Sequence, residues 1–138
     1  MKTGIEGKVA LVTGGARDVG REIALTLAAE GATVAVNYNS SPAEAEAVAE
    51  LIRSQGGKAA AFKADVSDYA QVQAMVAAVA KTFGRIDILV NNAGISGKSR
   101  IDESTAPEMW DQILNVNLQG LFNVTHAFVP ALKSTKGC

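Results

Sequence analysis

A glycine-rich loop suited to anion binding occupies residues 13–20, with the sequence Thr-Gly-Gly-Ala-Arg-Asp-Val-Gly. Glycines in such a loop let the chain turn sharply, and they let backbone N–H groups approach a pyrophosphate at the positive end of the following helix. The alternative is a tight turn between a strand and a helix that holds no ligand. The loop follows an apolar run and precedes a helical pattern, and this setting favours nucleotide binding.

The end of the second apolar run bears on which nucleotide fits. An acidic residue at this place hydrogen-bonds the ribose 2′-hydroxyl of NAD, whereas this sequence has Asn37 followed by Tyr38. Arg17 in the glycine loop can meet a 2′-phosphate instead. We therefore expect NADP(H) to be favoured, with NAD(H) as the alternative. If neither residue contacts a nucleotide, Arg17 is simply a solvated loop cation and Asn37 a turn residue.

The elements that must position these residues alternate along the chain. Short apolar runs without polar alternation predict strands that are covered on both faces. Helical patterns separate them, and strands joined by crossover helices imply a parallel sheet. The sequence thus predicts an α/β fold with a doubly wound parallel sheet in one domain. The predicted strands span residues 9–12, 33–36, 59–62 and 86–90.

Helix boundaries are also marked in the sequence. Residues 41–44 (Ser-Pro-Ala-Glu) and 105–108 (Thr-Ala-Pro-Glu) are typical of a capping box with proline in the first turn. Asp68 indicates a third helix start. Gly31, Gly56 and Gly84 stand where helices are expected to end.

Composition narrows the class of protein. The 138 residues include 13 Lys and Arg against 14 Asp and Glu, and this near-balance argues against a nucleic-acid partner. With 48% hydrophobic and 20% charged residues the chain is expected to be globular, and at this length it needs no metal to stabilise its core. The single cysteine, Cys138, suits a reducing compartment, and no apolar run approaches a membrane span. We expect a soluble cytoplasmic protein without a membrane partner.

Four motifs, in chain order, resemble the short-chain dehydrogenase/reductase family. The family's Thr-Gly-x-x-x-Gly-x-Gly pattern aligns with residues 13–20, and its Asn-Asn-Ala-Gly tetrapeptide with residues 91–94. Its Asp after the third strand matches Asp65, and its catalytic-tetrad Asn, in an Asn-x-x-Gly setting, matches Asn117. Residues 36–41 look most like those of 3-oxoacyl-acyl-carrier-protein reductases, which use NADPH. The resemblance implies a Rossmann-type sheet of order 3-2-1-4, with the ligand crevice between its first and fourth strands.

The loop, the strand ends and the resemblance together give a set of candidate site residues. Asn117 is the one catalytic candidate. The cofactor-binding candidates are Thr13, Gly14, Arg17, Asp18, Val19, Gly20, Asn37, Tyr38, Asp65, Val66, Asn91, Ala93 and Gly94.

One candidate departs from the family pattern. Asp18 replaces the family's middle glycine, and a carboxylate beside a pyrophosphate would weaken binding. We expect Asp18 instead to act as an N-cap that accepts from the amide of Gly20 or Arg21, with its charge offset by Arg17 and Arg21.

A second departure concerns catalysis. The family's catalytic Ser and Tyr-x-x-x-Lys lie on a fifth strand and the helix after it, and residues 1–138 contain neither; Tyr38 and Tyr69 are not followed by Lys at the fourth residue. Residues 1–138 are therefore expected to be the dinucleotide-binding, N-terminal portion of an NADP(H)-dependent oxidoreductase, truncated after its fourth βα unit. Such an enzyme transfers a hydride to or from a carbonyl or alcohol substrate. The alternatives are a nucleotide-binding module without activity and a non-functional truncation product.

The segment from residue 106 to about residue 132 predicts one long helix. Apolar side chains cover about two-thirds of its circumference, whereas one sheet contact buries a stripe of only about 100°. A second partner must cover the rest, and in the family the corresponding helix lies in a subunit interface, so we expect a homo-oligomer through this helix. An unpaired outer edge of the fourth strand would favour association further. Asn117 lies within the stripe and should be hydrogen-bonded. The expected polar face holds Gln112, Asn115, Gln119, Asn123 and His126.

Overall fold

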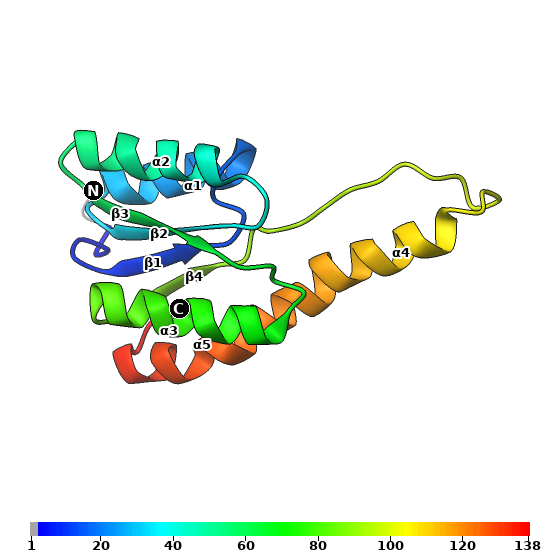
Figure 1. The fold of residues 1–138 in the computed structure, drawn as a ribbon. Coiled ribbons are helices and arrows are strands. Elements are labelled where there is room, and N and C mark those ends of the chain that lie inside the picture. The colour runs from blue at the N-terminus through cyan, green and yellow to red at the C-terminus, as the bar shows by residue number, and fades with distance from the viewer. Residues whose placement is uncertain (1–2) are drawn as a thin grey trace.

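A computed structural model describes residues 3–138 and places a four-stranded parallel sheet at the centre of the fold (Figure 1). The strand order is β3-β2-β1-β4, as the resemblance implies. The strands are β1 (Val9–Val12), β2 (Thr33–Tyr38), β3 (Lys58–Lys63) and β4 (Ile88–Val90). All carboxyl ends therefore meet at one edge of the sheet, where loops can build a common site.

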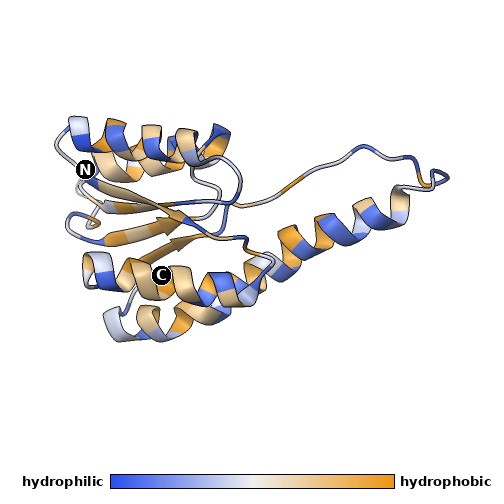
Figure 2. Cartoon of the chain, viewed as in Figure 1, coloured by the Kyte–Doolittle hydropathy of each residue, from blue (hydrophilic) through white to orange (hydrophobic). Residues whose placement is uncertain are grey.

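Helices cover both faces of the sheet, which confirms the doubly wound prediction. Helices α1 (Asp18–Ala29) and α2 (Pro42–Ser54) pack on one face, and α3 (Tyr69–Phe83) and α5 (Leu121–Thr135) pack on the other (Figure 1). The strands are largely hydrophobic, as the hydropathy colouring shows (Figure 2), and their buried residues belong to two core clusters. One core cluster joins Leu11 to Val72 and Phe128, and the other joins Val36 to Val48 and Ile52.

Helix ends follow the predicted punctuation, although two capping bonds are not formed. Gly31, Gly56 and Gly84 all have positive φ, which ends the preceding helices, and the Asp68 side chain caps α3. Hydrogen bonds from the side chain and backbone of Gln71 lower the pKa of Asp68. The predicted capping boxes are wrong in detail. Ser41 and Thr105 precede their helices but cap no N–H group, and Thr105 itself has helical backbone angles.

The predicted long helix is continuous but not regular. It consists of α4 (Ala106–Leu114), a π-helical turn η1 (Asn115–Gly120) and α5. The wider π-helical turn changes the angle at which later side chains leave the helix axis. A uniform spacing of about 100° per residue therefore assigns some of them to the wrong face. Asn123 was expected on the polar face, yet it is buried and donates to the Val66 carbonyl. The helix α4 extends away from the sheet (Figure 1).

Much of the apolar stripe on this helix stays open in the single chain. Val124 and Phe128 are buried against α3 and the sheet. Four large side chains in the preceding part of the helix remain exposed: Trp110, Leu118, Leu121 and Phe122. The excess apolar surface predicted from the sequence is therefore present.

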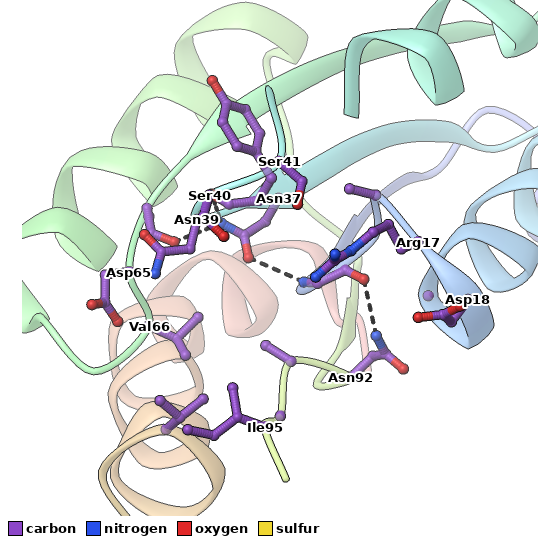
Figure 3. Close-up of a pocket in the computed structure, with 18 of the residues that line it drawn as sticks. Arg17, Asp18, Asn37, Asn39, Ser40, Ser41, Asp65, Val66, Asn92 and Ile95 are labelled. Atoms are coloured by element: carbon purple, nitrogen blue, oxygen red, sulfur yellow. Dashed lines mark hydrogen bonds between the residues drawn. The ribbon is translucent and has the colours of Figure 1, made fainter. Parts of the chain in front are cut away.

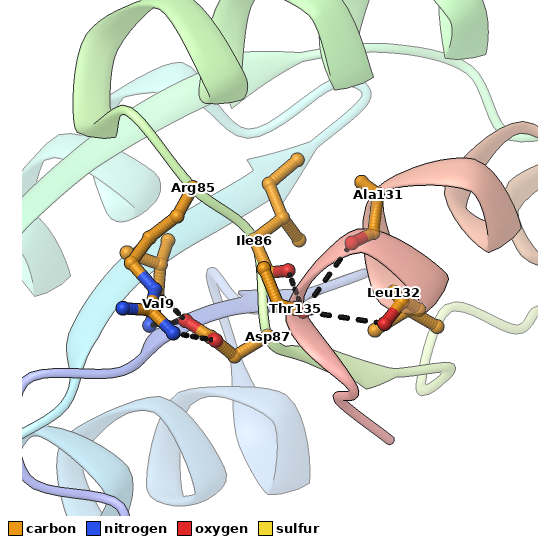
Figure 4. A network of polar contacts seen from close by, with 7 residues as sticks. All are labelled: Val9, Arg85, Ile86, Asp87, Ala131, Leu132 and Thr135. Atoms are coloured by element: carbon orange, nitrogen blue, oxygen red, sulfur yellow. Dashed lines mark hydrogen bonds and ion pairs between the residues drawn. The ribbon is translucent and has the colours of Figure 1, made fainter.

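The outer edge of β4 is not unpaired, contrary to expectation. The Cys138 N–H donates to the Asp87 carbonyl (2.8 Å), and the Leu89 N–H donates to the Cys138 carbonyl (2.9 Å). The end of α5 is fixed nearby, where the Thr135 hydroxyl donates to the Ile86 carbonyl (Figure 4). This short pairing satisfies backbone groups that the sequence analysis left open.

Residues 3–138 hold neither a helix suited to crossing a membrane nor a cluster of metal ligands. None of the helices described is long and apolar enough to cross a bilayer. Nor do three or more His, Cys, Asp or Glu side chains in this range converge where they could hold a metal ion.

Candidate functional site

A cavity of about 350 Å³ lies at the carboxyl ends of the strands (Figure 3). This volume falls in the range of roughly 300–1,000 Å³ that is usual for small-molecule sites. In the figure Asp65 and Val66 lie on one side of the cavity and Arg17 and Asp18 on the other. The residues around it come from the glycine loop and from the ends of β2, β3 and β4. They are Gly14, Ala16, Arg17, Asp18, Val19, Gly20, Asn37, Tyr38, Asn39, Ser40, Ser41, Ala64, Asp65, Val66, Asn92, Ala93, Gly94, Ile95 and Val116.

Backbone N–H groups of the glycine loop and the start of α1 form a set of unused donors. The N–H groups of Gly14 and Gly15 donate to the side chain and backbone of Asn37. Those of residues 16–20 donate to no acceptor among residues 3–138. Consecutive free N–H groups at a helix N-terminus attract anions, because the helix dipole adds to the donors. The donor set therefore fits a diphosphate.

Hydrogen bonds and close packing hold the glycine loop against the turn that follows β4. Asn92 donates to the carbonyls of Thr13 and Gly14, each at 3.1 Å. The Thr13 hydroxyl accepts from the N–H groups of Asn92 and Ala93, each at 3.0 Å. Thr13 is thus a buried positioning residue outside the cavity lining. A Cβ on Gly20 would overlap the Gly14 carbonyl oxygen, so glycine is required where the loop meets the helix.

The structure contradicts the expected capping role of Asp18. Arg17 holds the N-cap position, and Asp18 is the first helical residue, with a φ of +48°. Its carboxylate accepts no hydrogen bond from the described residues, and Arg21 pairs with Glu22 rather than with Asp18. A residue in the left-handed region directs its side chain differently from an extended N-cap residue, which explains the failure. Asp18 lies at the rim of the cavity.

The end of β2 presents no carboxylate to the cavity. Asn37, a cofactor-binding candidate, lies at the cavity wall but is buried, and its amide group is hydrogen-bonded to Gly14 and Ala64 of the protein itself. Tyr38 and the exposed residues Asn39 and Ser40 line the cavity at this place. Arg17 is exposed across from them and forms no ion pair within residues 3–138.

The turn after β3 is preorganised by its own side chains. Asp65 accepts from the N–H and the hydroxyl of Ser67, at 2.9 and 2.6 Å, and its own N–H donates to Gln71 at 3.1 Å. Val66 is buried beside it, and its carbonyl accepts from Asn123 at 3.0 Å. Both Asp65 and Val66 line the cavity, where the sequence placed them.

Some residues of the turn after β4 line the cavity, and others hold the surrounding structure in place. Ala93 and Gly94 line the cavity as expected, whereas Asn91 points away and donates to the Thr125 hydroxyl at 3.1 Å. Asn117, the catalytic candidate, bonds the Ile95 backbone at both amide ends, accepting at 2.8 Å and donating at 2.9 Å. The expectation that Asn117 is hydrogen-bonded is confirmed, and its partner is backbone.

Sequence reasoning missed several residues that line the cavity. Asn39, Ser40 and Ser41 follow the β2 residues that were chosen, and their small polar side chains at a strand end were an available signal. Ile95 and Val116 lie together only because η1 packs against the turn after β4. No local sequence pattern predicts this contact.

Comparisons with known proteins agree with this geometry. A family model described as short chain dehydrogenase matches residues 8–138. The chain is 47% identical over 123 residues to an uncharacterized oxidoreductase of Methylorubrum extorquens, covering 89% of this chain and 49% of that protein. It is 45% identical over 125 residues to the 3-oxoacyl-(acyl-carrier-protein) reductase FabG of Staphylococcus aureus, covering 91% of this chain and 50% of the relative.

A solved structure gives the same result. A short chain dehydrogenase from Burkholderia cenocepacia, crystallised in complex with NADP, superposes with a TM-score of 0.88 at 43% identity. The match covers 93% of this chain and 52% of the other. The chain thus spans about half the length of the relatives it matches, and the Ser and Tyr-x-x-x-Lys that the resemblance calls for do not occur in residues 1–138.

Proposed function

Because the chain belongs to the short-chain dehydrogenase family, we propose that its cavity binds NADP(H) for an oxidoreductase acting on a carbonyl or alcohol substrate. The observation that carries the proposal is the row of free N–H groups at residues 16–20, all of which line the cavity at the positive end of α1. Such donors suit a diphosphate held between the glycine loop and the turn after β4.

Selection of the phosphorylated nucleotide rests on the charges at the end of β2 and at Arg17 in the glycine loop. None of residues 37–41 is acidic, so the end of β2 brings no carboxylate to a 2′-phosphate, and the cation of Arg17 forms no ion pair within residues 3–138. Arginine binds phosphate through charge-assisted hydrogen bonds. The similar Burkholderia cenocepacia protein was crystallised with NADP, which supports the same preference here.

When bound, the nicotinamide group would supply or accept a hydride at its C4 carbon. In this chain Gly14, Ala93 and Asn92 would hold the middle of the nucleotide, and Asp65 and Val66 would flank the adenine side. The Staphylococcus aureus relative suggests a 3-oxoacyl thioester as the substrate class of the whole enzyme. The residues that would protonate the substrate are not in residues 1–138, so we expect this chain alone to bind nucleotide without turning substrate over.

Equilibrium titration by calorimetry tests the cofactor proposal. We expect NADPH to bind more tightly than NADH, and Arg17→Ala to weaken NADPH binding by about tenfold while leaving NADH binding unchanged. Arg21→Ala is the matched control, because Arg21 pairs with Glu22 and lies outside the cavity. Equal binding of the two nucleotides, unaffected by Arg17→Ala, would refute the NADP preference.

Turnover by this chain has its own test. NADPH consumption in the presence of a reactive ketone should stay at the background rate, because no Tyr-x-x-x-Lys is present. Appreciable consumption would overturn the view that the chain binds without catalysing. A cytoplasmic setting, suggested by the single cysteine, and a homo-oligomer through residues 106–132 complete the proposal.

A further inference from the structure

We infer that Asn37 is a positioning residue that ties the anion-binding loop to the adenine side of the cavity, so that one buried amide sets the distance between two halves of the nucleotide site. The inference rests on the proposed nucleotide-binding function, and it gives a specific role to Asn37, which the sequence analysis named only as a cofactor-binding candidate. Asn37 is only 2% exposed, and the carboxyl ends of three strands surround it.

The oxygen of the Asn37 side chain orients the glycine loop. It accepts from the Gly14 N–H at 3.2 Å, and the Asn37 backbone carbonyl accepts from the Gly15 N–H at 2.9 Å. Gly14 has a φ of +62°, so its peptide could turn in more than one direction. These two bonds fix the turn so that the N–H groups of residues 16–20, and not those of Gly14 and Gly15, are left for the anion.

The nitrogen of the same side chain fixes the end of β3. It donates to the Ala64 carbonyl at 3.1 Å and to the Phe62 carbonyl at 3.3 Å. Ala64 directly precedes Asp65 and Val66, which line the adenine side of the cavity. A displacement of the Ala64 peptide would therefore carry both residues with it.

Only an amide satisfies all of these partners at once. The Gly14 N–H needs an acceptor, whereas the Phe62 and Ala64 carbonyls need donors, and the carboxamide carries both groups on one planar side chain. An aspartate at this place keeps the acceptor but turns an oxygen toward two carbonyl oxygens in a buried site. A threonine offers a single hydroxyl and suits the strand, so it retains part of the arrangement.

Three variants test the inference by NADPH titration and by hydrogen exchange of the Gly14 amide. Asn37→Asp is expected to weaken NADPH binding at least tenfold, and Asn37→Thr about threefold. Asn37→Ala should also speed exchange of the Gly14 amide, which has lost its acceptor. Thr135→Val is the stability control, because it removes the hydroxyl bond to the Ile86 carbonyl far from the cavity, and it should lower the melting temperature without changing the affinity for NADPH.

Each result decides a separate point. Folded Asn37→Thr or Asn37→Asp protein that binds NADPH within twofold of the wild-type affinity would overturn the inference. If Asn37→Asp does not fold, Asn37→Thr carries the test alone. If the wild-type chain binds no nucleotide, the proposed function fails, and exchange of the Gly14 amide still decides whether Asn37 orients the loop: an unchanged rate in Asn37→Ala would contradict it.

Discussion

Asp18 combines an unfavourable backbone angle with a charge at the rim of an anion site. Its φ of +48° lies in the left-handed region, which costs an ordinary residue about 1–2 kcal/mol and aspartate somewhat less. Its carboxylate has no partner among residues 3–138 to offset a nearby phosphate. Backbone and charge can be separated by substitution.

We predict that Asp18→Asn, which keeps the tolerance for this φ and removes the charge, tightens NADPH binding by about three- to tenfold at low salt. The gain should shrink at high salt because the repulsion is screened. Calorimetric titration at two ionic strengths measures it, with Glu22→Gln as a control for removal of an exposed carboxylate on the same helix outside the cavity. No change with Asp18→Asn at low salt would contradict the electrostatic argument.

The cost of the positive φ at Asp18 can be measured as a difference in protein stability. Asp18→Ala should be less stable than Asp18→Gly by about 1 kcal/mol, because alanine has no means of offsetting a positive φ and glycine pays no Cβ penalty there. Urea unfolding of the two variants measures the difference. Equal stability would mean that Asp18 does not hold this conformation in solution.

Asp87 is the buried carboxylate on which the start of β4 depends. It is 1% exposed and accepts from the Val9 N–H at 2.9 Å and from Arg85 Nε at 2.8 Å (Figure 4). Burial alone would raise the pKa of Asp87, but the hydrogen bonds from Arg85 and Val9 and the positive charges of Arg85 and Lys8 outweigh it and leave the pKa below its ordinary value.

A lowered pKa means that the ionised Asp87 stabilises the fold above the unfolded-state value of about 3.9, and that this contribution is lost as the pH falls through the lower folded-state value. We therefore predict that Asp87→Asn costs about 1–3 kcal/mol of stability at neutral pH. The cost should shrink below about pH 4. Thermal unfolding of both proteins between neutral and acid pH measures it. A cost that stays constant into acid would contradict the assignment.

At the scale of elements, the π-helical turn η1 controls how the last helix meets the site. It presents Asn117 to the Ile95 backbone and lets Gly120 pack on Val66. A Cβ on Gly120 would lie 2.5 Å from Val66 Cγ2 and 3.1 Å from its Cβ, so the helix approaches this closely only because residue 120 is glycine.

Gly120→Ala is predicted to destabilise the protein by about 1–3 kcal/mol through overpacking, and to weaken nucleotide binding because Val66 must move. Urea unfolding and NADPH titration measure the two effects. Leu121→Ala, at an exposed neighbouring position, should leave nucleotide affinity unchanged. Wild-type stability and affinity in Gly120→Ala would show that the helix does not pack this tightly on Val66.

The sequence was sufficient for the elements and insufficient for their finer geometry. Continuous apolar runs such as residues 9–12 and glycine ends such as Gly84 depend on local physics, so strands, helices and parallel pairing were predictable. The position of Asn123 was not, because a π-helical turn depends on packing against Val66 rather than on the helical periodicity of the sequence.

The candidate site also contains residues that local sequence predicts and residues that it does not. Gly14, Gly20 and Asp65 could be chosen as cofactor-binding candidates because a glycine loop and a strand end are local features, and all three line the cavity. Whether a side chain faces the cavity or supports it depends on partners distant in sequence. Asn37 and Thr13 are buried as supports, because Asn37 donates to carbonyls at the end of β3 and just after it, and Thr13 accepts from an N–H group after β4. Neither set of partners can be identified from the neighbouring residues.

At the scale of the whole molecule, the uncovered apolar surface of the last helix predicts self-association. Trp110, Leu118 and Phe122 are 65%, 63% and 59% exposed, and they lie on one continuous helical path. Clusters of large exposed apolar residues usually mark contact surfaces. We predict a dimer or higher oligomer by analytical ultracentrifugation.

The same measurement on Phe122→Asp tests which surface is used. This substitution should shift the population toward monomer, because a buried charge opposes the contact. Lys81→Asp, at an exposed position on α3, is the control for a change of charge and should not shift it. A wild-type chain that sediments as a monodisperse monomer would contradict the oligomer prediction.

Amide chemical shifts in a titration with NADP show whether the free N–H groups of the glycine loop hold a dinucleotide phosphate. We expect the largest changes at residues 16–20, with further changes at residues 38–41, 65–66 and 93–95. Saturating NADP that leaves the amides of residues 16–20 unmoved, or that shifts only residues remote from this cavity, would contradict it.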